Sequence, residues 1–270
     1  RDAAFGYSRW RLNPVVTFLT GAEYTRYDEP TVTKAERFSG KIGLLLQPRT
    51  GTMVRAALFQ GVKGSKYDRE GLEPTQFNGF NQVFDDFNGT RWTRGALAVD
   101  QHFAGGAALG AEVSSRHLDV PGLGCTGEAC LAHWHEDLHR VYMALPFGTR
   151  VAASAEWRYE NSHINDDPRQ LSMFPYRLRT DLVPIRLWVK AGTGSINLEN
   201  WAVRQNARMP DAFTGSDLVG HSAFSVMNLR YSMPLIGKDV VASLGASNVF
   251  DRRFRFQNAD YNGDPKAPLF

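Results

Sequence analysis

Hydrophobic and polar residues alternate with a period of two along most of this chain. Between residues 151 and 159 the odd positions are Val, Ala, Ala, Trp and Tyr, and the even positions are mainly polar. Residues 107–116 and 227–233 repeat the pattern. Successive side chains of a β-strand point to opposite faces, so this period predicts strands with one apolar face and one polar face. No long segment of the sequence has the 3.6-residue period of an amphipathic helix.

The connections between these strands alternate in length. Short ones are expected at 47–52, 103–107, 146–150, 190–194 and 234–239, and long polar ones at 64–91, 118–133, 161–176 and 206–220. A repeated order of strand, short turn, strand and long loop predicts an antiparallel up-and-down meander. We expect about twelve strands, with a partial one at the start of the chain.

Two environments suit such a meander. In a soluble barrel or sandwich the apolar face is buried, whereas in a transmembrane barrel it faces lipid and the polar face lines the lumen. The alternating turn lengths favour the membrane, as do aromatic residues near strand ends, such as Trp92, Trp134 and Trp157. The predicted fold class is therefore an all-β, antiparallel up-and-down transmembrane β-barrel with about 12–14 strands visible. Its expected location is the bacterial outer membrane, with lipid as a partner.

Composition and net charge do little to decide between a soluble and a membrane protein. The chain has no run of about 18 apolar residues, which a membrane-spanning helix requires and a spanning β-strand does not. Its net charge of +3 is too small to indicate nucleic acid as a partner. We expect all 270 residues to belong to a single barrel domain, 1–270.

The polar face carries many charged residues. Those predicted to line the lumen are Arg55, Arg94, Asp100, Glu112, Arg116, Glu156, Arg158, Arg186 and Arg230. Burying so many charges in a dry core would be very costly, so the set indicates a wet, ion-paired interior. Two interpretations remain open: a selective pathway for a polar solute or polymer, or a structural salt-bridge network inside a plugged or narrow barrel.

Candidate chemistry is otherwise sparse. The sequence HWHEDLH at 133–139 places His133, His135 and His139 on one face of a strand, where imidazoles could bind a transition metal. His135 and His139 would lie about 13 Å apart on an extended strand, too far for one ion. We treat His133 and His135 as weak metal candidates only and expect no metal, no cofactor, no catalytic residues and no enzymatic activity.

Cys125 and Cys130 are the two cysteines of the chain. A disulfide between them would close a small loop and would imply an oxidising compartment. Two free thiols in a loop are the alternative. We expect the disulfide, within an extracellular loop.

The stretch SLGASNVFDRRF, residues 243–254, resembles the region near the end of TonB-dependent receptor barrels, where a strand runs into a motif of the type N-[VL]-F-D-[RK]-x-[FY]. The matching residues are Asn248, Val249, Phe250, Asp251, Arg252 and Phe254. The resemblance implies an outer-membrane barrel, in which this polar, aromatic and cationic end is a strand leaving the membrane at an interface. An unrelated strand end followed by a turn is the other interpretation.

Residues 72–90, LEPTQFNGFNQVFDDFNGT, resemble a loop of the barrels that follow tetratricopeptide repeats in outer-membrane export proteins. The two resemblances imply different directions of transport. An importer of the receptor type would need an upstream plug domain, and a repeat-linked exporter would need upstream repeats or partner subunits. Neither is visible in this sequence.

The last residues, NGDPKAPLF, include Pro265 and Pro268, and two prolines so close together disfavour a spanning strand. We therefore expect a portion of a larger barrel, truncated at the N-terminus and lacking its closing C-terminal strand. Two functions stay open: a transport pathway, or a structural or surface-interaction barrel that binds a partner through its extracellular loops without transport.

Overall fold

The computed structural model describes residues 2–29, 33–64, 73–84, 86–121, 131–164, 175–210, 216–236 and 240–256. Its strands are β1 (Asp2–Arg11), β2 (Val16–Glu29), β3 (Thr33–Arg49), β4 (Thr52–Val62), β5 (Gln76–Phe77), β6 (Phe80–Asn81), β7 (Arg91–His102), β8 (Ala108–Pro121), β9 (Leu131–Phe147), β10 (Val151–Ile164), β11 (Arg177–Ala191), β12 (Gly194–Pro210), β13 (Asp217–Ile236) and β14 (Val240–Ala246). The described part of the chain contains no helix that could span a membrane.

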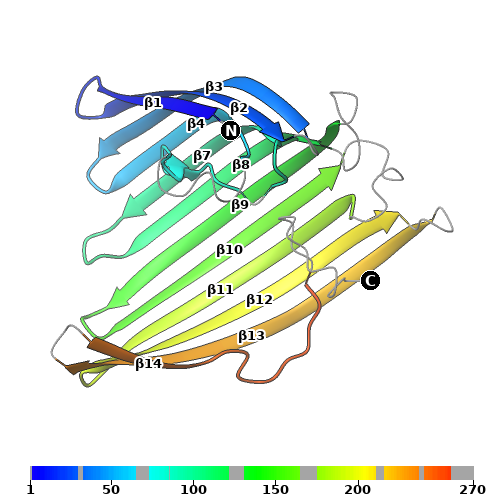
Figure 1. Cartoon of the computed structure of the whole chain (residues 1–270). Helices are drawn as coiled ribbons and strands as arrows, with labels where there is room; N and C mark the ends of the chain where they lie inside the picture. Colours follow the sequence, from blue (N-terminus) through cyan, green and yellow to red (C-terminus); the bar gives the residue numbers. More distant parts are fainter. Residues whose placement is uncertain are drawn as a thin grey trace.

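Twelve of these strands form one antiparallel sheet in the order β1-β2-β3-β4-β7-β8-β9-β10-β11-β12-β13-β14. Every strand of this sheet pairs with its neighbours in the sequence, apart from the small β5–β6 hairpin between β4 and β7. The all-β, antiparallel up-and-down arrangement predicted from the sequence is thereby confirmed. Figure 1 shows the sheet curving from β1 to β14. Among the described residues, these two edge strands do not pair with each other.

The strands are longer than the alternation alone predicted. β8 continues to Pro121 and β9 begins at Leu131, although residues 118–133 were expected to form a loop. Asp119 still pairs with His133 across these strands. The difference arises because the backbone makes the ladder of hydrogen bonds, so polar side chains do not end it. The short connections expected at 103–107 and 146–150 are turns, in which Gly105, Gly106 and Gly148 have positive φ angles.

The hairpin β5–β6 folds onto the concave face of the sheet. Phe77 pairs with Phe80 across the two-residue turn Asn78-Gly79. The φ angles of these turn residues are 50° and 79°, as a type I′ turn requires, and Asn-Gly is the sequence that accepts them most readily. In Figure 1 the hairpin lies inside the curve made by β1 to β8.

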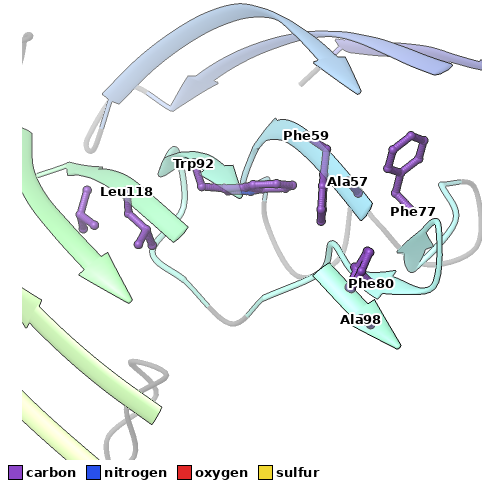
Figure 2. Packing of buried hydrophobic residues seen from close by; sticks show 8 residues of the cluster. Ala57, Phe59, Phe77, Phe80, Trp92, Ala98 and Leu118 are labelled. Carbon is purple, nitrogen blue, oxygen red and sulfur yellow. The ribbon is translucent and has the colours of Figure 1, made fainter. Parts of the chain in front are cut away.

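The hydrophobic core lies between this hairpin and the sheet. Its buried members are Ala57, Phe59, Phe77, Phe80, Trp92, Ala98, Leu118 and Val120. In Figure 2 the ring of Phe59 lies between Phe77 and Trp92, at centroid distances of 5.7 and 5.6 Å. Such tilted and edge-on contacts add to the free energy that aromatic burial supplies.

The two faces of the sheet differ sharply outside this core. The side chain of Phe59 is 0% exposed on the concave, inner face, and that of its neighbour Leu58 is 52% exposed on the convex, outer face. Other exposed apolar residues of the outer face are Ile42, Leu97, Leu109, Val113, Val141 and Ile185. Buried charged residues of the inner face are Glu23, Lys41, Arg94, Asp100, Glu112 and Arg116. The sheet therefore places apolar side chains outside and many charges inside.

The Asn248–Phe254 motif follows the end of β14 directly and begins with a turn, in which the N–H of Asp251 donates to the carbonyl of Asn248 at 2.8 Å. β14 stops at Ala246, opposite Leu229 in the apolar part of β13. Asn248 has a φ of 49°, and its side-chain amide and carbonyl bond the carbonyl and N–H of Arg252, each at 3.0 Å. These local hydrogen bonds compete with strand pairing, as is usual for asparagine.

The inner core gives a testable stability difference between two adjacent residues. Phe59→Ala should lower the free energy of unfolding by about 3–5 kcal/mol, because it removes the ring that joins the hairpin to the sheet. Leu58→Ala is the matched control and should cost clearly less, since half of that side chain is already outside the protein interior. Urea titration of the purified protein measures both changes in the free energy of unfolding. A larger loss for Leu58→Ala would mean that the core is misplaced.

Candidate functional site

The inner face and the segment that lies on it form the candidate site. We call residues 73–84 and 86–90 the inner segment. Side chains from β1, β3, β4, β7 and β8 contact it by polar interactions. These five strands belong to one half of the sheet, so the inner segment is held against the concave face at several separate points.

Lys41 anchors the beginning of the inner segment. Its ammonium group donates to Glu73 at 2.7 Å, to Gln82 at 2.8 Å and to the hydroxyl of Tyr7 at 3.0 Å. A second carboxylate, that of Glu23, lies 3.3 Å away. Lys41 is only 2% exposed and Glu23 only 1%. A lysine so deeply buried keeps its charge only when oppositely charged groups and acceptors surround it, as they do here.

Asn78 anchors the tip of the hairpin. Its amide nitrogen donates to the backbone carbonyls of Leu44, at 3.0 Å, and Ala56, at 2.9 Å. The backbone carbonyl of Asn78 accepts from the guanidinium group of Arg55 at 3.3 Å. Gly43 leaves the required room, since a Cβ atom there would lie 3.1 Å from that of Asn78. The tip therefore docks against backbone groups of β3 and β4.

Two arginines hold the rest of the inner segment. Arg94 donates to the carbonyl of Asn81 at 2.7 Å. Arg116 binds both carboxylate oxygens of Asp86, at 2.7 and 2.9 Å, and its guanidinium carbon lies 3.7 Å from the ring centre of Phe84. Bidentate pairing and stacking on an aromatic ring are the two contacts that a planar guanidinium makes best.

Beyond the inner segment, the charges continue across the sheet as a connected row. We call this row the charge ladder, and its members in order are Arg94, Glu112, Arg140, Glu156, Arg158 and Glu160. Successive members are separated by 3.1, 3.9, 2.9, 2.8 and 3.7 Å. All members of the ladder except Glu156 border a cavity of about 350 Å³, together with Gln76, Asn81 and Phe84 of the inner segment. The cavity thus offers both donors and acceptors in alternation.

The residues predicted to line the lumen fall into two groups. Arg94, Glu112, Arg116 and Arg158 border the cavity just described. Glu156 is joined to that group through its salt bridges with Arg140 and Arg158. Arg55 lies nearby in a 2.9 Å salt bridge with Asp100, which also accepts from Tyr142.

Arg186 and Arg230 lie apart from that group. They border a second hollow, of about 600 Å³, on the inner face of β11 to β14. Arg186 pairs there with Glu199 at 2.5 Å.

Sequence reasoning missed several contributors to the site. Lys41 was overlooked because the run Leu44 to Leu46 conceals the alternation of β3. Arg140 was overlooked because it follows the histidine-rich stretch. The hairpin itself had a usable signal: the dipeptide Asn78-Gly79 between two phenylalanines is typical of a two-residue turn. Nothing in the sequence indicates that the hairpin folds inward.

The histidines of β9 share the outer face, away from the charge ladder. His133 contacts Asp119 at 2.9 Å, and His135 contacts both His117 and Asp137 at 3.0 Å. His139 packs against a tyrosine ring instead. Among the described residues, no three metal-ligating side chains converge in a way that could hold an ion. Cys125 and Cys130 lie outside the described residues, as do Pro265 and Pro268.

Comparison with known proteins adds no relative. No protein-family model matches the chain, and no curated protein or solved structure matches it either. The function is therefore inferred from the geometry of the inner face and from the distribution of apolar residues outside it.

The docking of Asn78 can be tested by a single-atom change. Asn78→Asp replaces the amide nitrogen by an oxygen that faces two backbone carbonyls, so it should weaken docking of the inner segment by about 2–4 kcal/mol. Proteolytic cleavage within residues 73–90 should become faster. The control is Asn81→Asp, since the Asn81 amide donates within the segment, to the backbone carbonyl of Val83 at 2.6 Å, and contacts no strand of the large sheet among the described residues. Equal cleavage of both variants would contradict the anchoring role of Asn78.

Proposed function

We propose that this chain is the wall of a bacterial outer-membrane β-barrel that provides a pathway for a polar solute or polymer. The observation that carries the proposal is the reversed distribution of residues over the sheet. Apolar side chains such as Leu97, Val113 and Ile185 are exposed on the outer face, while charged ones are buried inside. Water disfavours such an apolar band, whereas hydrocarbon solvates it and leaves the polar face for a lumen.

The physics of a bilayer adds a requirement to this proposal. A sheet edge inside hydrocarbon leaves backbone N–H and C=O groups without partners, at a cost of several kcal/mol for each group. The edges of β1 and β14 must then be paired in the membrane. The proposal therefore includes further strands that close the barrel, from outside the described residues or from another subunit.

The inner segment and the charge ladder define the proposed pathway. A solute that passes beside the ladder meets guanidinium and carboxylate groups in alternation, so it can exchange its hydration for protein contacts without meeting one dominant charge. The inner segment narrows one side of the interior. A narrowed, alternately charged channel suits a hydrated polar solute or an uncharged polymer chain better than a simple ion.

Two modes of transport remain within the proposal. A TonB-dependent-receptor-like importer draws on the resemblance of residues 248–254, and a repeat-linked exporter on that of residues 72–90. The sequence that precedes Arg1 in the full-length protein would separate them. A plug domain there would favour import, and helical repeats of about 34 residues would favour export.

A second candidate function is a structural or surface-interaction barrel without transport. It is favoured by the pairing of the interior charges, above all the buried cluster of Lys41, Glu23 and Glu73. A fully satisfied network of this kind can serve as a fixed plug. The long connections would then bind a partner at the membrane surface.

Lipid exposure of the outer face can be tested by single cysteines in a background with Cys125 and Cys130 changed to serine. A fluorophore at Ala155, which pairs with Met143 and Ile185 in the outer band, should be quenched by lipid-borne probes. A cysteine at the adjacent Ser154 should instead react with water-soluble reagents. If neither position contacts lipid, the protein is not a membrane barrel, and the transport proposal fails with it.

Transport can be tested by recording the full-length protein in planar bilayers. Replacing both Arg140 and Arg158 with glutamine leaves the ladder carboxylates in excess, so the reversal potential in a KCl gradient should shift toward cation selectivity. Glutamine at Arg179 and Arg204 removes the same charge from the outer face and should not shift it. If neither the natural protein nor its Asn78→Asp variant conducts, the non-transporting function is supported instead.

A further inference from the structure

β11 and β12 carry a sharp boundary on their outer face. From the short-turn end, the paired outward residues are Val189 with Ile196, Leu187 with Leu198, Ile185 with Asn200, Val183 with Ala202, Asp181 with Arg204, Arg179 with Asn206, and Arg177 with Arg208. Four largely apolar rows are thus followed by three polar rows. Each row advances by about 7 Å along the strands, so the change occurs within a single step.

The polar rows have a large excess of positive charge. We call Arg177, Arg179, Arg204 and Arg208 the outer arginine patch. Three of the four are exposed, and Arg177 is half-buried. Within the described residues, no carboxylate lies within salt-bridge distance of any of them. The inner face of the same strands differs, because Arg186 there is paired with Glu199.

Two carboxylates near the outer arginine patch, Asp181 opposite Arg204 and Asp217 beside Tyr176, offset only part of the charge of its four arginines. Asp181, in the row nearest the apolar band, accepts from the indole of Trp157 at 3.3 Å. Asp217, at the far rim, accepts from Tyr176 at 2.6 Å, and this hydrogen bond raises the pKa of the Tyr176 phenol. His163 and His221 lie on the neighbouring strands and can only add positive charge.

Arg177 and Arg208 stand directly opposite each other across the two strands. Like charges in that position destabilise a sheet, so the arrangement costs free energy in the isolated chain. An anion that accepts from both guanidinium groups would remove the cost. Phosphate suits them best, because its oxygens match the planar fork of arginine and accept bidentate hydrogen bonds.

We infer that the outer arginine patch binds the phosphate of a lipid headgroup whose acyl chains lie on the apolar rows of β11 and β12. The inference rests on the proposed membrane location of the outer face. Two features favour a lipid over a soluble anion: the patch is continuous with the apolar band, and Trp157 lies at the boundary, where indole rings mark membrane interfaces. One ligand then satisfies both halves of the surface.

The test compares binding of phosphatidic acid and of diacylglycerol with the same acyl chains to the full-length protein in detergent, by native mass spectrometry. Phosphatidic acid should bind to the natural protein more tightly than diacylglycerol does. The variant with Arg177→Gln and Arg208→Gln should bind phosphatidic acid about 30-fold more weakly than the natural protein, because each arginine near an anionic lipid contributes about 1 kcal/mol. The control variant, Arg150→Gln with Lys190→Gln, removes two charges at the opposite end of the sheet. It should bind phosphatidic acid within about twofold of the natural protein.

Several results would overturn the inference. Equal binding of the two lipids, or equal loss in both variants, would show that the outer arginine patch does not recognise phosphate. Inorganic pyrophosphate has no acyl chains. If it binds through the same arginines as tightly as phosphatidic acid does, the acyl chains are not recognised. Far-UV circular dichroism checks that both variants keep their strand content. The quenching of a probe at Ala155 tests the membrane location without involving the outer arginine patch. If that probe is quenched by lipid but the protein shows no preference for phosphatidic acid, the phosphate site is refuted and the proposed membrane location stands.

Discussion

The fold of this protein depends on one electrostatic constraint: each charge on the inner face must have an opposite charge or a hydrogen-bond acceptor beside it. Moving an unpaired ion away from water costs several kcal/mol even after relaxation. Arg116 illustrates how the constraint is met. It is 4% exposed, yet it contacts the carboxylates of Asp86 and Glu136 and the ring of Phe84. Asp86 and Phe84 belong to the inner segment. That segment therefore supplies partners that the charged residues of the sheet need, in addition to occupying space on the concave face.

This dependence works in both directions. The inner segment has only two short strands of its own, which alone could not stay folded in water. Its conformation is imposed by Lys41, Arg94 and Arg116, whose charges require the acceptors that the segment supplies. A transport function would use this mutual support to hold a constriction at one place. A plugged barrel would use the same contacts to prevent passage, so the contacts alone do not decide between the two functions.

The sequence was sufficient to predict the sheet, because a two-residue period that lasts for ten or more residues is rarely produced by anything but a β-strand. It also placed Arg94, Glu112 and Glu156 together on one face, since parity along a strand determines the face. It could not reveal which charges pair, because Arg94 and Glu112 belong to different strands and their contact depends on register. The inward fold of the hairpin was hidden for a related reason. Its anchor, Asn78, donates hydrogen bonds to backbone carbonyls of β3 and β4. Every residue has a backbone carbonyl, so the sequence of β3 and β4 does not indicate that they accept these hydrogen bonds.

The same pair of strands shows how differently charge is treated on the two faces. On the inner face of β11 and β12, Arg186 and Glu199 are opposite each other and form a salt bridge. On the outer face, Arg177 and Arg208 are opposite each other and repel. Exchanging one of these two arginines for an acidic residue would remove the repulsion between them. The arrangement becomes favourable when the counter-charge comes from outside the chain. In the proposed membrane location, the apolar rows beside the arginines would be covered by an external partner as well, and a lipid would meet both requirements at once.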